Sequence, residues 1–442
     1  MTRLSVLPKQ EYPLRRQKLM AQLPEGSVVL VCAAATAIRN GDVDHAYRQD
    51  SYMYYLTGFV ESGSALLMRK TETGFDSLIL CLEKDRLQET WHGRRLGVEA
   101  APASLQLDEA KPISELDASL DVWLDGADIV YSAQGRSDVK QHIDASSMRL
   151  RGRARQGAQA PEFYADLDVV LNEMRLIKSD AELSVMRQAC DISARAHQRL
   201  MQSSQPGVME YQLGAHFSHA CSMEASPRLA YGSIVAGGDN ACILHYENNN
   251  QPLLDGDLVL IDAGCEIDYY AADITRTFPV NGCFSEPQKQ IYNIVLEALE
   301  AAIAVVKDGV PVNAMQDAAV QVITQGLVDL GILKGDVTQL IKEEAYKPFY
   351  LHGVGHWLGM DVHDVGQYKI DGQWRPLRAG MVTTVEPGIY IAADTADVDA
   401  RWLGLGVRIE DNIVVTNNGH ENFTRRVPVT VDAIEALMQN AE

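Results

Sequence analysis

The sequence lacks the long hydrophobic runs that insertion into a membrane requires. The apolar stretch SVVLVCAAATAI, residues 27–38, is too short to span a bilayer and predicts a buried strand instead. The amino-terminal segment MTRLSVLPKQEYPLRR has no apolar run long enough for a signal peptide. We therefore expect a soluble, cytoplasmic protein with no membrane partner.

Positive charge and paired cysteines are also scarce. The chain has 39 lysines and arginines against 60 acidic residues, which gives a formal net charge of −21. This balance excludes nucleic acids and anionic membranes as partners, because both require a positive face, and most of the acids serve solubility. The seven cysteines are scattered, odd in number and without a CxxC pair. They predict reduced, mostly buried thiols rather than a disulfide framework or a zinc knuckle.

The length of 442 residues exceeds one ordinary core and predicts two domains, 1–172 and 173–442. The first is expected to be an α/β domain, with a helix over 15–23 and strands over 27–33, 65–69 and 77–82. The segment MRLRGRARQG, residues 148–157, carries four arginines. We interpret this run as solvated surface, and the alternative is a contact with an acidic neighbouring subunit or a substrate carboxylate.

The second domain contains a repeated pattern of helices. Ser179 with Glu182, and Ser285 with Gln288, predict two amphipathic helices that each begin with a capping box. A turn and a further helix-like segment follow each of them, at 203–220 and 306–323. The similarity between the two stretches predicts duplicated halves with a site between them, where pockets commonly lie.

The segment HGVGHWLGMDVHDVG, residues 352–366, holds three histidines. His352 and His356 have the i, i+4 spacing of helical zinc sites, but Gly353 and Gly355 lie between them, and each costs a helix about 1 kcal/mol. The glutamate of the helical zinc motif is missing as well. We therefore expect strand and loop here, with ligand partners from elsewhere in the chain.

Four acidic residues at the ends of apolar strands are candidate partners. Asp262 ends the run LVLI, Asp273 lies on the adjoining strand, and Glu386 and Glu410 flank two further apolar strands. Each of these residues alone has a simpler interpretation, as the cap of a turn or as one partner of an ion pair. For Glu410 that partner would be Arg408. Together with one histidine, however, four carboxylates would repel one another strongly without divalent cations. Two bridged metal ions accommodate them, and oxygen-rich ligation with one imidazole favours Mn, Co or Fe.

Five segments in series carry a resemblance to a known family. They are MRLIKSDAE, LIDAGCEIDYYAADITRTF, LHGVGHWLGMDVHDVG, VEPGIY and GVRIEDNIVV. The chain resembles the pita-bread metallopeptidases, most closely the bacterial Xaa-Pro aminopeptidases (aminopeptidase P). YRQDSYMYYLTGFVE and ETWHGRRLG resemble the amino-terminal domain of that family. The resemblance implies an α/β amino-terminal domain and a catalytic domain with a curved, mostly antiparallel sheet in two pseudo-duplicated halves.

The resemblance also implies two divalent ions, with Mn²⁺ expected, and assigns their ligands. Asp273 and Glu410 would bridge the ions, Asp262 would hold one, and His356 and Glu386 would hold the other. The implied substrates are peptides with proline in the second position. A hydroxide shared by the metals would attack the carbonyl of the first residue, and Glu386 would carry the proton to the leaving nitrogen.

Further residues take roles from the same resemblance. His363 and His245 are expected to stabilise or orient the carbonyl, whereas His352 is a substrate contact or a structural histidine. Arg408 anchors the substrate or neutralises the carboxylates. Candidates for lining the pocket are Tyr390, Tyr368 and, at a border with another subunit of a homodimer or homotetramer, Trp91.

Four other functions compete with this interpretation. A prolidase, which cleaves Xaa-Pro dipeptides, would share all five ligands, although Glu386 and Glu410 are closer in sequence here than in prolidases. Methionine aminopeptidases normally lack a domain like residues 1–172, and metal-free relatives have lost the ligands. A dinuclear phosphatase would need a basic phosphate-binding loop, which is not evident. One departure is Gly355, which is often serine in the closest enzymes.

Overall fold

The computed structural model describes residues 7–224 and 228–439, so the start of the amino-terminal segment lies outside it. The chain divides into two compact units, one over Pro8–Met174 and one that begins at Arg175 and also takes in Leu7. The predicted boundary after residue 172 falls inside helix α7 (Asp168–Leu176) and stays a prediction. No helix among the described residues has the length and apolar character that crossing a membrane demands.

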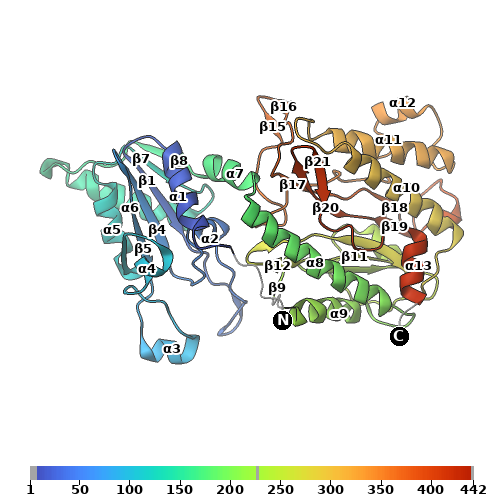
Figure 1. Ribbon diagram of the computed structural model, residues 1–442, viewed down its shortest axis with the longest axis horizontal. Coiled ribbons are helices and arrows are strands. Elements are labelled where there is room, and N and C mark those ends of the chain that lie inside the picture. Colours follow the sequence, from blue (N-terminus) through green and yellow to red (C-terminus); the bar gives the residue numbers. More distant parts are fainter. Residues whose placement is uncertain (1–6, 225–227, 440–442) are drawn as a thin grey trace. The chain divides into compact units, whose positions relative to one another are not determined.

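The first unit is an α/β layer structure around one mixed sheet, with helices on its faces (Figure 1). The sheet has the order β6-β5-β4-β1-β7-β8, antiparallel at β5-β4-β1 and parallel elsewhere. Its strands are β1 (Ser27–Cys32), β4 (Ala65–Thr71), β5 (Gly74–Cys81), β6 (Glu109–Pro112), β7 (Ile129–Ser132) and β8 (Phe163–Asp166). The helices described around it are α1 (Glu11–Gln22), α2 (Ser51–Thr57), α3 (Arg86–His92), α4 (Ala101–Leu105), α5 (Leu116–Leu124) and α6 (Ser137–Gly152).

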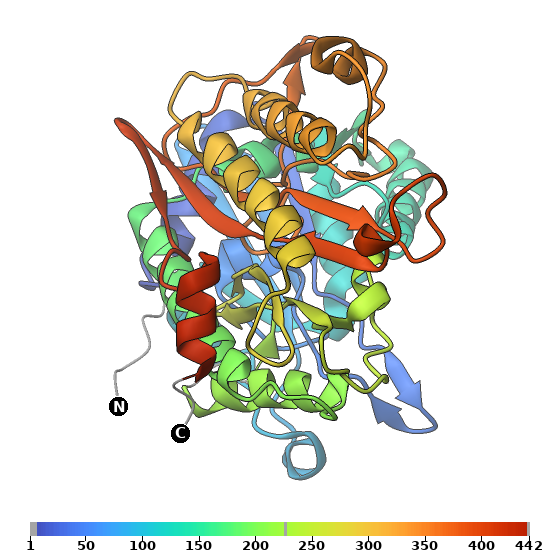
Figure 2. The same cartoon turned by 90° about the vertical axis from the view of Figure 1, so that its right-hand side faces the viewer.

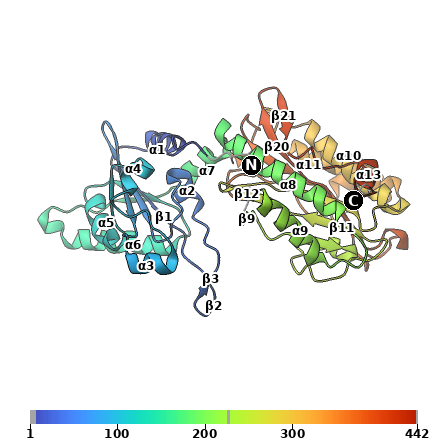
Figure 3. The same ribbon diagram turned by 60° about the horizontal axis from the view of Figure 1, so that its bottom comes forward.

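The predicted helix and the three predicted strands of this unit are all present: apolar residues of the strands form its core cluster, and Leu19 and Met20 of the helix are buried. Two parts project from that core. A short hairpin of β2 (Ile38–Asn40) and β3 (Val43–Asp44) extends away from the sheet (Figure 3), and Trp91 on α3 is 76% exposed. In the arginine run, Arg149 and Arg153 form ion pairs with Asp121 of the same unit.

The second unit has two helix pairs, as the repeated pattern predicted. They are α8 (Asp180–Gln202) with α9 (Glu210–Met223), and α10 (Glu286–Ala304) with α11 (Ala314–Asp329). Both predicted capping boxes are formed. Figure 2 shows α8 and α9 in green beside the yellow strands, and α10 in gold across the orange and red strands, with α11 packed against α10. Two further helices are α12 (Val337–Lys342) and α13 (Val431–Gln439).

The strands of the second unit pair antiparallel in small sheets. The first half contains β9 (Arg228–Leu229), β10 (Ile234–Gly237), β11 (Leu258–Asp262), β12 (Cys265–Ile267), β13 (Tyr270–Ala271) and β14 (Thr275–Pro279). The second half contains β17 (Val382–Val385), β18 (Gly388–Ile391), β19 (Leu405–Arg408), β20 (Asp411–Thr416) and β21 (Gly419–Asn422), preceded by the short hairpin of β15 (Lys369–Ile370) and β16 (Gln373–Trp374). Residues 352–366 are loop without the expected strand, apart from one isolated bridge between Trp357 and Thr383.

Helix α8 anchors the segment that follows β11. The ring of His197 donates from Nε2 to the carbonyl oxygen of Ala263 at 2.9 Å, and the Cys265 N–H donates to Ser193 Oγ at 3.0 Å. Gly264 lies between these anchors, where a Cβ would stand 1.7 Å from the carbonyl oxygen of Ala272. The turn therefore requires glycine, and the helix fixes the backbone directly after Asp262.

The buried His197 makes the stability of this unit depend on pH. Burial lowers the pKa of His197 to about 4, because water cannot solvate the imidazolium and Nδ1 has no hydrogen-bond partner among the described residues. The folded state therefore holds the ring neutral at a pH where the unfolded chain protonates it. The stability that this provides is complete above about pH 6.5 and is lost as the pH falls towards 4.

We expect the wild-type protein to lose about 2 kcal/mol more stability between pH 7.5 and pH 5 than His197→Gln. Glutamine retains a donor for the Ala263 carbonyl but does not titrate in this range. Urea unfolding of the metal-free proteins at both pH values measures the difference, in which the contributions of all other groups cancel. Equal losses in the two proteins would show that the ring is not held neutral.

Candidate metal centre

The two halves of the second unit bring their acidic residues together through the same arrangement of paired strands. Asp262 ends β11, and its antiparallel partner β14 is preceded by Asp273. Glu386 follows β17, and its antiparallel partner β20 is preceded by Glu410. We had expected Asp273 to lie within its strand, but it lies just before the strand begins. Each half contributes two carboxylates from the adjoining ends of paired strands.

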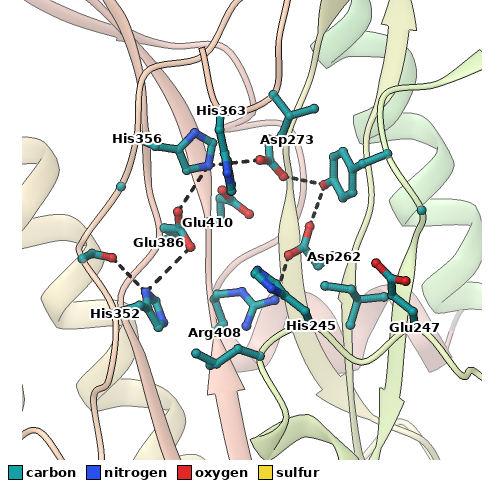
Figure 4. Close-up of a pocket in the computed structure, with 17 residues that line it drawn as sticks. His245, Glu247, Asp262, Asp273, His352, His356, His363, Glu386, Arg408 and Glu410 are labelled. Atoms are coloured by element: carbon teal, nitrogen blue, oxygen red, sulfur yellow. Dashed lines mark hydrogen bonds and ion pairs between the residues drawn. The ribbon is translucent and has the colours of Figure 1, made fainter. Parts of the chain in front are cut away.

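These side chains line one pocket of about 630 Å³, together with four histidines and Arg408 (Figure 4). Asp273, His356 and Glu410 each present one ligand atom, and the three atoms lie within 4.8 Å of one another. His356 Nε2 is 3.4 Å from a carboxylate oxygen of Asp273 and 3.4 Å from one of Glu386. The arrangement matches a metal site in donor type and spacing.

The pKa values of the cluster reflect burial and the repulsion among its carboxylates. Burial and the neighbouring carboxylates raise the pKa of Glu410 well above its ordinary value and that of Glu386 to about 7. Burial opposes the charge on His356, but hydrogen bonding and attraction to Asp273 outweigh it and raise its pKa to about 9. Burial opposes the charge on Asp273 in turn, but hydrogen bonding and attraction to His356 lower its pKa. Divalent cations bound among these side chains would relieve the repulsion.

Tyr231 is a member of the site that the sequence did not reveal. Its hydroxyl lies 2.6 Å from Asp262 Oδ1 and also contacts Asp273 Oδ1. One phenol therefore links the two carboxylates of the first half. No local pattern marks Tyr231, because the segment RLAYGSIVAGG that contains it has no motif of its own.

Arg408 connects Asp262 to the opposite wall of the pocket. It is 3% exposed and donates to Asp262 Oδ2 at 2.7 Å and to the Tyr390 hydroxyl at 3.1 Å. The Tyr390 oxygen is 2.7 Å from Nε2 of His352, whose Nδ1 donates to the carbonyl oxygen of Gly353. Burial lowers the pKa of His352 to about 4, so the ring is neutral near pH 7 and its Nε2 accepts from Tyr390. Both nitrogens are satisfied within the protein, which favours the structural interpretation of His352.

Buried polar groups outside the pocket hold the carboxylates in place. Thr275 donates to Glu410 Oε2 at 2.7 Å, and Thr384 donates to Glu386 Oε1 at 3.2 Å. The fully buried Arg276 donates to the carbonyl oxygen of Glu410 at 2.6 Å and pairs with Asp411 at 2.7 Å. Since β14 carries Arg276 and β20 begins at Asp411, this ion pair ties the two halves together behind the site.

The remaining predicted residues occupy different positions. His245 and His363 are exposed to the pocket, and the rings of His363 and His356 are 4.2 Å apart. Tyr368 stacks on Trp357 with ring centroids 5.0 Å apart, and its hydroxyl accepts from the backbone N–H of Trp357, so it supports the histidine loop. It is not among the pocket-lining residues. Trp91 belongs to the other unit.

Gly355 has a steric reason to be glycine. A Cβ at this position would stand 2.0 Å from the carbonyl oxygen of Thr384, which itself accepts from Thr383 Oγ1. The backbone beside His356 therefore packs directly on β17. A serine here would require that strand or the loop to shift.

Comparisons with known proteins agree with this geometry. Residues 184–417 match the model for "Metallopeptidase family M24", and residues 12–131 match "Aminopeptidase P, N-terminal domain". The chain is 47% identical to an Xaa-Pro aminopeptidase of Haemophilus influenzae, over 98% of each chain.

Solved structures extend the similarity to three dimensions. The chain resembles Pseudomonas aeruginosa aminopeptidase PepP with a TM-score of 0.98, 49% identity and 99% coverage of both chains. It also resembles Zn-substituted Escherichia coli aminopeptidase P in complex with product, with a TM-score of 0.97, 44% identity and coverage of 99% and 100%. The chain belongs to metallopeptidase family M24, with an amino-terminal domain of the aminopeptidase P type.

Proposed function

We propose that the protein is a metal-dependent Xaa-Pro aminopeptidase, which removes the first residue from peptides with proline in the second position. The observation that carries this proposal is the group of Asp273, His356 and Glu410, which lines the pocket with closely spaced ligand atoms. Full-length similarity to proteins named Xaa-Pro aminopeptidase supports the same activity. We also propose a cytoplasmic location and a homo-oligomer, as expected from the sequence.

We assign the metal ligands to Asp262, Asp273, His356, Glu386 and Glu410, for two divalent ions. Mn²⁺ is our first choice because the donors are mostly oxygen with one imidazole. Such ions supply Lewis acidity, which polarises a carbonyl and lowers the pKa of water towards neutrality. Tyr231 and Arg408 would keep Asp262 in position, through the contacts that they make with its two oxygens.

The reaction adds water across the first peptide bond. The water oxygen bonds to the carbonyl carbon, the C–N bond breaks, and one proton must reach the nitrogen of proline. Glu386 is our candidate to carry this proton, because its carboxylate lines the pocket beside the proposed metal ligands. His245 and His363 face the pocket and can donate to the carbonyl oxygen as it becomes negative.

The specificity has a chemical explanation. An Xaa-Pro amide has no N–H, so an enzyme that recognises that hydrogen cannot cleave the bond. A site that binds the carbonyl and the free α-amino group avoids the requirement. Asp262 lines the pocket, and we place the amino end of the substrate beside it.

Hydrolysis of three matched peptides tests the proposed function. We expect chelated protein to be inactive, and added Mn²⁺ to restore cleavage of the first bond of Ala-Pro-Pro. Ala-Pro should be cleaved more slowly and Ala-Ala-Pro hardly at all, while all three share the same first residue. Faster cleavage of Ala-Pro than of Ala-Pro-Pro would mean a prolidase, and no cleavage by metal-loaded protein would contradict the proposal.

His363→Ala tests the assignment of an oxyanion donor. We expect a fall in kcat of about 100-fold with a small change in KM, because the lost interaction forms mainly in the transition state. Metal content should be unchanged, since His363 is not one of the proposed ligands. His216→Ala, which removes an exposed histidine from α9, is the matched control. An unchanged kcat in His363→Ala would leave this histidine without a catalytic role.

A further inference from the structure

Glu247 differs from every other acidic residue that lines the pocket. Asp262, Asp273, Glu386 and Glu410 each have a hydrogen bond or ion pair to a neighbouring side chain. Glu247 is exposed and has no hydrogen bond or ion pair with any of the described residues. Two divalent ions would compensate the four buried carboxylates, whereas the charge of Glu247 would remain open to a ligand.

The backbone around Glu247 is held firmly although its side chain is free. The preceding Tyr246 is buried, and its hydroxyl donates to Glu210 at 2.9 Å. Two residues later, Asn249 accepts from the Val235 N–H at 2.9 Å, which ties this segment to β10. The backbone of Glu247 therefore stands at a fixed place beside the pocket, so only the side chain has to be ordered when the carboxylate binds a cation.

The position of Glu247 in the pocket determines which part of the substrate lies beside it. Figure 4 shows Glu247 on the same side as His245 and Asp262, with His352, Glu386 and His356 opposite. The proposed function, on which this inference rests, places the amino end of the peptide at Asp262 and the leaving nitrogen near Glu386. Glu247 then lies beside the first residue of the peptide and away from the proline.

We infer that Glu247 is a specificity-determining residue that favours a cationic side chain, arginine or lysine, at the first position of the substrate. The α-amino group is common to all substrates, so its binding, which we place at Asp262, does not distinguish one first residue from another. A side chain that extends from the first residue meets the open carboxylate of Glu247. Arg408 also lines the pocket and could pair with Glu247 in place of the substrate. Its guanidinium is buried, however, and forms an ion pair with Asp262.

A pair of isosteric substrates tests this inference. Arg-Pro-Pro and citrulline-Pro-Pro have first residues of almost equal shape, but only the first carries a charge. We expect wild-type kcat/KM to favour the arginine peptide about three- to fivefold, the range of a partly exposed ion pair. In Glu247→Gln this ratio should fall to about one, and added salt should lower the wild-type ratio, because ions screen exposed charges.

Glu297→Gln is the matched control, because Glu297 is an exposed glutamate of α10 that does not line the pocket. It should keep the wild-type ratio. An unchanged ratio in Glu247→Gln would overturn the inference alone. An equal loss on both peptides would do the same, because Glu247 would then bind the shared α-amino group. If metal-loaded wild-type protein cleaves neither peptide, the proposed function fails and the inference with it.

Discussion

Repulsion among four carboxylates is the constraint on which the catalytic unit is built. Asp273 and Glu410 are at most 4% exposed, and Asp262 and Glu386 lie beside them. Bringing such groups together without cations is costly, because buried charges interact strongly and water cannot screen them. The pKa values of Glu386 and Glu410 are raised for this reason. The fold holds these acids in proximity, in an arrangement that divalent ions would stabilise.

Several layers of contacts maintain that arrangement. Paired strand ends fix the backbone in each half, and Arg276 joins the halves through its buried ion pair with Asp411. Threonine hydroxyls and the phenol of Tyr231 then orient individual carboxylate oxygens. Helix α8 holds the turn after Asp262 through a neutral histidine. Each contact is individually modest, and together they determine where the oxygen atoms point.

The sequence predicted those parts of the fold that depend on local patterns. Capping boxes and apolar periodicity located α8, α10 and the central strands, because these signals are contained in a few neighbouring residues. The sequence placed Asp262 and Glu386 at the ends of apolar strands, but it expected Asp273 within a strand and part of the histidine segment as strand; family resemblance gave their roles. Tyr231, Thr275 and Arg276 were missed, because their importance comes from partners distant in sequence. The free carboxylate of Glu247 likewise becomes evident only when the pocket wall is assembled.

Anomalous diffraction at the manganese edge, from crystals grown with Mn²⁺, tests the central claim most directly. The account predicts two peaks in the pocket, both adjoining Asp273 and Glu410, with His356 and Glu386 beside one and Asp262 beside the other. Crystals of Asp273→Asn, grown in the same way, should lose at least one peak. A wild-type map with no peak among these residues would contradict the metal centre, and a single peak would contradict the two-ion assignment.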